Sequence, residues 1–217
     1  MDAYLKAAII QGIFETLQMT FVSSFFAYVL GLPVGIILYV TAKGHLFENK
    51  AVNLFVGTIV NLLRSLPFLI LLVVMVPVTR FIVGSSIGTW ASIVPLSVGA
   101  VPIIARMVES SLNEVPSGII EAATSMGASP LFIVFKFILP EAVPSLIFGA
   151  AINIATILGF SAMAGAIGGG GLGAIALQYG YYRFDKVVLW TTVAILVVMV
   201  MVIQESGSIL SKKIRKS

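Results

Sequence analysis

Few side chains in this sequence can carry enzymatic chemistry, and their placement does not favour catalysis. The chain has no cysteine, which excludes disulfides, thiolate nucleophiles and cysteine-ligated zinc together. Its one histidine, His45, lies in a short loop near Lys43, so a histidine metal site is excluded as well. No nucleophile with a base, pair of carboxylates or metal-ligating cluster converges at one site. The sequence therefore predicts that this chain is not an enzyme, has no catalytic residue and binds no metal or cofactor itself.

A glycine run is the one pattern that could suggest a nucleotide site. Gly168 to Gly171 and Gly173 formally contain the pattern G-x-G-x-x-G. A dinucleotide-binding run follows a strand, but no strand precedes this one, and the phosphate-binding P-loop pattern is absent from the sequence. Any ATP that drives this protein must therefore be hydrolysed by another chain. We interpret the run as a mobile outer loop whose backbone can approach a docked protein or line a pore mouth.

The segment 106–141 contains clear signals for a short helix. It is a long connection that holds four of the nine acidic residues. Pro116 and Ser117 open the helix, and Gly127 supplies the left-handed residue that ends it. A helix, a tight glycine turn and a second helix are therefore expected here.

The second helix of this segment has its own start and stop signals. Ser129 is suited to be the N-cap and Pro130 the first helical residue. We expect this helix to run to Ile138, because Leu139 and Pro140 should break it before the next long apolar run.

The first of these two helices presents an apolar ridge. Ala122 and Ala123 make a small-side-chain surface one turn from Ile119, Met126 stands near them at helical spacing, and Glu121 lies beside them. Such a ridge can dock in a groove on another protein, or the two helices can pack against the ends of membrane spans. The residue pattern alone leaves both interpretations open.

The elements that must position these residues are membrane helices. Hydrophobic residues make up 59% of the chain and charged residues 10%, whereas a soluble domain is about one-quarter charged. Five nearly uncharged runs are suited to cross a bilayer, and they cover residues 17–40, 54–78, 87–105, 142–163 and 187–203. Before them lies an external N-terminal segment, 1–16, and after them a basic tail, 206–217. Because the 13 basic residues are spread singly among apolar runs, the net charge of +4 does not indicate nucleic acid.

The second run contains Arg64 and, three residues later, Pro67. Two structures fit this pattern. Either Ala51–Leu63 lies along the membrane interface and the span begins near Arg64, or one long helix is kinked where Pro67 removes a backbone donor. Arg64 is then either a functional or paired charge at membrane depth, or an arginine that reaches to the cytoplasmic boundary.

Basic residues predict the orientation of the spans. If the loop after the first span faces the cytoplasm, eight basic residues lie inside and four outside, which agrees with the positive-inside bias. The inside set is Lys43, Lys50, Arg106, Lys136, Lys212, Lys213, Arg215 and Lys216. The N-terminus is therefore expected outside the cytoplasmic membrane and the C-terminus inside.

The run EAATSMGASPLFIVFKFILP, residues 121–140, resembles the loop signature of binding-protein-dependent ABC importer permeases. The matching positions are Glu121, Ala122, Ala123, Gly127, Leu139 and Pro140. Phe137 stands where the signature has isoleucine, a mild departure. The resemblance implies that Ile119 to Ser129 form a coupling helix that seats in an ATPase subunit. Similarity to the methionine-importer permeases extends over nearly the whole chain, through runs such as RSLPFLILLVVMVPVTRFIVG and GFSAMAGAIGGGGLGAIALQYGYY.

This resemblance implies an all-α membrane protein with five spans in the type I importer permease fold. It further implies a homodimer, two ATPase subunits that hold ATP and Mg, and an extracytoplasmic methionine-binding lipoprotein. The ATPase-coupling residues would be Ile119, Glu121, Ala122, Ala123, Met126, Gly127, Leu139 and Pro140.

Polar residues of the fourth span are candidates for a wet path. Asn153, Thr156 and Ser161 can line it, although serine and threonine commonly bond their own helix backbone instead. In the family, Met163 falls in a serine-alanine-methionine stretch that faces the pore region. Met163, Ser161, Asn153 and Arg64 are therefore carried as pore or gate residues.

The predicted function is an ABC importer permease for D-methionine, L-methionine or both, working by alternating access. A permease for another small amino acid or sulfur compound is the first alternative. An ion-coupled secondary transporter is the second, but no Asp or Glu lies within the five predicted spans, and no internal repeat is visible.

Overall fold

The computed structural model describes residues 3–215, and over that range it contains helices and no strands, which confirms the all-α class. The α-helices are α1 (Ala3–Thr41), α2 (Lys50–Ser65), α3 (Phe68–Val74), α4 (Val76–Val83), α5 (Thr89–Asn113), α6 (Ser117–Ser125), α7 (Pro130–Ile133), α8 (Leu139–Ala166), α9 (Gly171–Ile175) and α10 (Lys186–Arg215). Two wider π-helical turns complete the set, Val134–Ile138 before α8 and Ala176–Tyr181 after α9.

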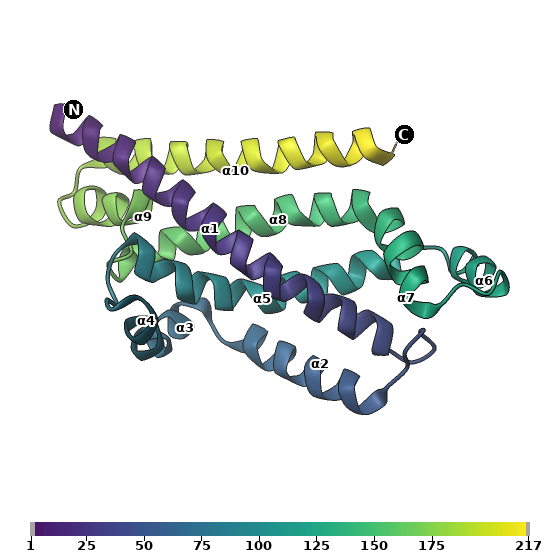
Figure 1. The fold of residues 1–217 in the computed structure, drawn as a ribbon. Coiled ribbons are helices and arrows are strands. Elements are labelled where there is room, and N and C mark those ends of the chain that lie inside the picture. Colours follow the sequence, from purple (N-terminus) through teal and green to yellow (C-terminus); the bar gives the residue numbers. More distant parts are fainter. Residues whose placement is uncertain (1–2, 216–217) are drawn as a thin grey trace.

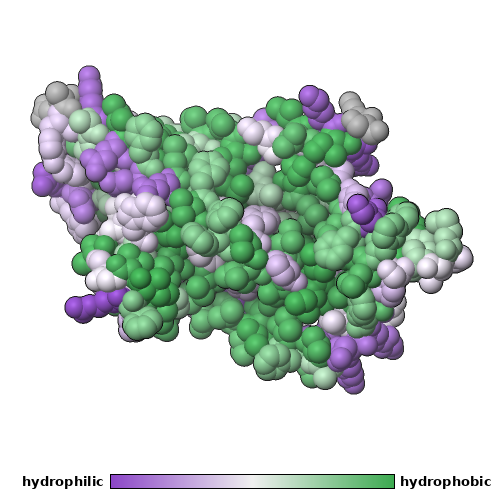
Figure 2. Space-filling model, in the orientation of Figure 1, coloured by the Kyte–Doolittle hydropathy of each residue, from purple (hydrophilic) through white to green (hydrophobic). Residues whose placement is uncertain are grey.

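Four of the described helices are long and apolar enough to cross a membrane, and a bent pair raises the number to five. The four cover Tyr4–Thr41, Thr89–Asn113, Pro130–Ala166 and Lys186–Arg215, and the bent pair is α2 with α3. In Figure 1, α1 crosses α5 and α8 diagonally, while α10 runs beside α8. The view of Figure 2 shows a broad apolar surface between two ends where hydrophilic residues gather. This distribution matches a chain that is embedded in lipid.

The second apolar run is a broken helix. α2 continues through Arg64 to Ser65, and the chain is extended at Leu66, with φ −77° and ψ 124°. Proline disfavours helical geometry in the residue before it and cannot donate its own backbone bond, so Pro67 ends α2 and stands at the start of α3. The two helices meet at 100°. The sequence left two structures open here, an interfacial helix followed by a span or one helix kinked at Pro67, and the chain does change direction at Leu66 and Pro67, in a full break rather than a kink.

The predicted helix break at Leu139 and Pro140 is wrong. The helical chain runs on from Pro130 to Ala166 without leaving helical geometry. The backbone N–H of Leu139 donates to the carbonyl of Val134, five residues back, which marks a wide π turn. Because Pro140 follows this wide turn and sits in the first turn of α8, its missing N–H and its ring are accommodated.

One continuous apolar core joins α1, α5 and α8. Its fully buried side chains include Met19 of α1, Leu96 and Ile104 of α5, and Ile157 of α8. Close approach of α1 and α5 depends on a glycine: a Cβ on Gly35 would lie 2.6 Å from both the carbonyl oxygen of Ala105 and the Cβ of Val108. Small residues at such crossings let helix backbones come together in a membrane, where packing drives association.

Candidate coupling helix and translocation residues

The short helix α6 projects from one end of the bundle, opposite the end that holds α9 and the N-terminal part of α1 (Figure 1). Pro116 precedes it in an extended conformation, with φ −58° and ψ 131°. Gly127 follows it with φ +78°, and the Ala128 N–H closes the turn on the Ala123 carbonyl at 3.1 Å. A Cβ on Gly127 would meet nothing within 4 Å, so glycine is required here by backbone conformation rather than by space. The predicted helix and its left-handed glycine cap are confirmed.

The structure divides the predicted coupling residues of α6 into two faces. Ala123 is 1% exposed and belongs to the core, and Ile119 packs against that core. Glu121 and Ala122 are exposed, and Met126 is 72% exposed. The inner face therefore anchors α6, and the outer face exposes a small residue, a carboxylate and a thioether.

Leu139 and Pro140, the remaining members of the predicted coupling set, lie in the wide-turn region rather than on α6. Leu139 packs against the core, and Pro140 is exposed in the first turn of α8. They stand in the connection between α6 and the long helix α8, and their predicted coupling role stays a prediction.

A pocket of ≈ 480 Å³ separates α6 from the loop that follows α1. Glu121 and Ile120 line it from α6, and Tyr39 and His45 line it from the other side, where their rings meet edge to face at 4.4 Å. The outer part of α6 thus stands clear of the bundle.

The four pore or gate candidates fall into two pairs. Asn153 is 4% exposed, and its Nδ2 donates to the Tyr28 hydroxyl of α1 at 3.1 Å. Ser161 is 1% exposed, and its hydroxyl donates to the Leu158 carbonyl at 2.7 Å. Met163 is 47% exposed, and Arg64 is exposed with no ion pair to any described residue. The first pair is buried within this chain, and the second pair is available to other molecules.

The glycine run is not the free outer loop that the sequence suggested. The Gly171 N–H donates to Glu15 Oε2 at 2.7 Å, and the Leu172 N–H donates to Thr16 Oγ1 at 2.9 Å. Gly173 packs directly on the backbone of Ala162 in α8. These glycines let the short helix α9 fold back against α1 and α8, so the run is a packed turn and not the mobile loop that was predicted.

A polar network between α2 and α5 was missed by sequence reasoning. Arg106 pairs with Glu109 at 2.7 Å, and its second terminal nitrogen donates to Asn61 Oδ1 at 2.8 Å. The spacing of Arg106 and Glu109 by three residues on a helix was a readable signal for their ion pair. The participation of Asn61 was not readable, because it depends on how α2 packs against α5.

A family model and curated relatives match this sequence over most of its length. The family model described as "binding-protein-dependent transport system inner membrane component" matches residues 31–216. The probable D-methionine transport system permease protein MetI of Vibrio cholerae is 47% identical over 200 residues, which cover 92% of this chain and 89% of the relative. The D-methionine transport system permease protein MetI of Escherichia coli is 56% identical over 157 residues, 72% of each chain.

Two solved structures of ABC transporters contain chains with a similar fold. A structure of the MetNI methionine ABC transporter in inward-facing conformations contains a chain that superposes with a TM-score of 0.97 at 50% identity and 99% coverage of both chains. A crystal structure of an amino acid ABC transporter matches with a TM-score of 0.79 at 19% identity, which supports the fold alone.

Proposed function

Because this chain belongs to the family of binding-protein-dependent transport system inner membrane components, we propose that it is the permease subunit of an ABC importer for D-methionine, L-methionine or both. In this proposal two copies of the chain form the translocation path. Two partner ATPase subunits hold ATP and Mg, and an extracytoplasmic binding protein delivers the substrate. The permease itself carries out no bond chemistry.

The observation that carries the proposal is the form of α6. It is a short capped helix that projects from the bundle, anchored by Ala123 and displaying Met126. Exposed apolar side chains on a projecting helix are suited to bind in a groove of another protein. A pore or a secondary transporter without a partner does not require this element.

We propose that the end of the bundle with α6 faces the cytoplasm and that the N-terminal end of α1 lies outside. Figure 1 places the C-terminal end of α10, with its basic residues Lys212, Lys213 and Arg215, at the same end as α6. The positive-inside bias supports this orientation. The membrane-spanning domain would then cover residues 17–205, flanked by the external segment 1–16 and the cytoplasmic tail 206–217.

The proposed mechanism is alternating access. ATP-driven closure of the two ATPase subunits would displace α6, and the attached helices would move with it. Met163 and Arg64 are exposed on this chain, and we assign them to the path or its gate. Asn153 and Ser161 are buried among the helices of this chain, and we assign them to the support of α8 behind that path.

Reconstitution tests this function. Proteoliposomes that contain the permease, the ATPase and the binding protein should take up labelled D- or L-methionine only when ATP is present. Omission of the ATPase should abolish uptake, and an excess of unlabelled methionine should compete better than other small amino acids. Uptake driven by a proton or sodium gradient without the ATPase would refute the proposal, and stronger competition by another amino acid would change the substrate.

A further inference from the structure

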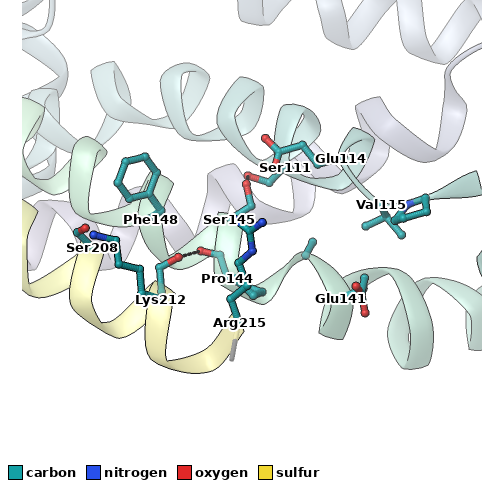
Figure 3. Close-up of a pocket in the computed structure, with 13 residues that line it drawn as sticks. Ser111, Glu114, Val115, Glu141, Pro144, Ser145, Phe148, Ser208, Lys212 and Arg215 are labelled. Carbon is teal, nitrogen blue, oxygen red and sulfur yellow. Dashed lines mark hydrogen bonds between the residues drawn. The ribbon is translucent and has the colours of Figure 1, made fainter. Parts of the chain in front are cut away.

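A second pocket, of ≈ 580 Å³, lies where α5 ends, α8 begins and α10 ends (Figure 3). Its volume falls in the range of small-molecule sites, about 300–1,000 Å³. Ser111 and Glu114 line it from α5 and its end, Ser145 and Phe148 from α8, and Arg215 from α10. It is distinct from the docking face of α6, which lies beyond Pro116.

Four charged side chains line this pocket, and none of them forms an ion pair with another residue of the range 3–215. Lys212 and Arg215 enter it from α10, while Glu114 and Glu141 lie on the other side of it. Among the described residues, the one ion pair within 4 Å joins Arg106 and Glu109, so none of these four charges is neutralised by another. Two cations and two carboxylates held apart in one pocket match a ligand that carries both signs of charge.

Serine hydroxyl groups that line the pocket form hydrogen bonds between its three helices, α5, α8 and α10. The Ser211 hydroxyl of α10 donates to the Pro144 carbonyl of α8 at 2.6 Å. The Ser145 hydroxyl of α8 donates to the Ser111 hydroxyl of α5 at 3.1 Å. These serines give the pocket a polar surface that is fixed by hydrogen bonds within the chain. The same bonds hold together the helices that carry the charged groups of the pocket.

On the side toward the membrane-spanning part of the helices, the pocket is lined by an aromatic side chain beside Ser208 (Figure 3). Phe148 lines the pocket and is 48% exposed. On α10, apolar side chains remain exposed up to the level of the pocket, as at Met201 and Leu210. A ligand with a polar head and hydrocarbon chains could place its head among the charges and its chains along this apolar surface.

We propose that this pocket binds the headgroup of a zwitterionic phospholipid, with its phosphate at Lys212 and Arg215 and its primary ammonium at Glu114 and Glu141. An arginine fork and a lysine ammonium are the groups that proteins use for phosphate oxygens. A primary ammonium can donate to two carboxylates, which a quaternary ammonium cannot do. A purely anionic headgroup would meet the two carboxylates unfavourably. The inference rests on the membrane location of the chain and not on the transported substrate.

A free amino acid has the same two charges, so the experiment separates the two sources. The purified permease–ATPase complex is studied by native mass spectrometry after addition of phosphatidylethanolamine, phosphatidylglycerol or phosphatidylcholine with identical acyl chains. A parallel series adds free methionine as a competitor. We expect phosphatidylethanolamine to be retained in preference to the other two lipids, with no displacement by methionine.

Matched variants assign the retention to this pocket. Lys212→Ala with Arg215→Ala should weaken retention of phosphatidylethanolamine by about tenfold or more, since charge-assisted bonds are lost. Glu114→Gln with Glu141→Gln should remove the preference over phosphatidylglycerol. Lys43→Ala, which removes one exposed positive charge outside the pocket, should have no effect.

Three results would overturn the proposal. Equal retention of phosphatidylglycerol by the unaltered complex would indicate a general anion site. Unchanged lipid retention in both paired variants, with the complex intact by size-exclusion chromatography, would place the lipid elsewhere. Displacement of the lipid by free methionine would identify an amino acid as the ligand.

Discussion

Gly173 provides the sharpest test of how the glycine-rich turn and α9 are packed. It lies in the short helix α9, against the backbone of α8. A Cβ at this position would lie 2.6 Å from the Cα of Ala162 and 2.8 Å from its carbonyl carbon, and closer still to its carbonyl oxygen. These neighbours are backbone atoms, which cannot rotate away as a side chain can. The substitution Gly173→Ala must therefore displace α9 from α8.

The expected magnitude follows from two opposing effects. Replacing glycine by alanine in a helix gains about 0.5–1 kcal/mol of stability through backbone entropy. Inserting a methyl group into a close-packed interior typically costs about 1–3 kcal/mol, and the upper part of this range is appropriate where backbone must move. Gly173→Ala is thus expected to be destabilising. Gly57→Ala is the matched control, because the added Cβ would lie 3.5 Å from Arg106 Nη2 and 3.8 Å from Leu38 Cδ2, which is ordinary contact.

Thermal unfolding of the detergent-purified permease measures this difference, followed by the fluorescence of Trp90 and Trp190. About 1 kcal/mol shifts the melting temperature of a chain of this size by roughly 2–4 °C. We expect the Gly173→Ala protein to melt several degrees below the unaltered protein, and the Gly57→Ala protein to melt at the same temperature or above it. Equal melting temperatures for the two variants would refute the packing of α9 against α8.

The other predictions concern the coupling turn and the path. Gly127→Val should abolish ATP-driven uptake, because a left-handed residue other than glycine costs about 1–2 kcal/mol and a branched one is least tolerated, whereas Gly127→Asn should retain most uptake; equal activity of the two variants would contradict a conformational role. Asn153→Ala combined with Tyr28→Phe in a double-mutant cycle of unfolding should give a coupling energy of about 0.6 kcal/mol, and at most about 1.7, with uptake preserved; loss of uptake without loss of stability would return Asn153 to the path. Met163→Ala should alter uptake or basal ATP hydrolysis, and a variant unchanged in both would remove Met163 from the gate.

The sequence predicted the coupling segment well because its signals are local. Pro116, Gly127 and Pro130 act on the backbone of their immediate neighbours, so a helix, a left-handed turn and a new helix start could be read without knowledge of the fold. Composition predicted the membrane class for a similar reason, since hydrocarbon as a solvent constrains every span alike.

The sequence could not predict features that depend on which helices meet. The glycines of residues 168–173 are compatible with a flexible loop or with tight packing, and the choice is made by Glu15 and Thr16, more than 150 residues away. Pro140 reads as a helix breaker, but a wide turn before it removes the conflict. Asn153 reads as a pore residue, although its partner Tyr28 places it inside the chain.

The packing of α6 explains how, in the proposed mechanism, a displacement of α6 can reach the long helices α1, α5 and α8. Ala123 of α6, Leu112 of α5 and Ile157 of α8 belong to one continuous buried cluster, which reaches Met19 near the middle of α1. Close-packed interiors resist continuous deformation, so a displacement of α6 is transmitted as a movement of packed helices rather than absorbed near the turn. Gly127 fits this arrangement because its backbone fixes the angle of α6 while its surroundings are open. In the proposed function, coupling therefore needs the anchored inner face of α6 as well as the exposed outer face that we propose for the ATPase contact.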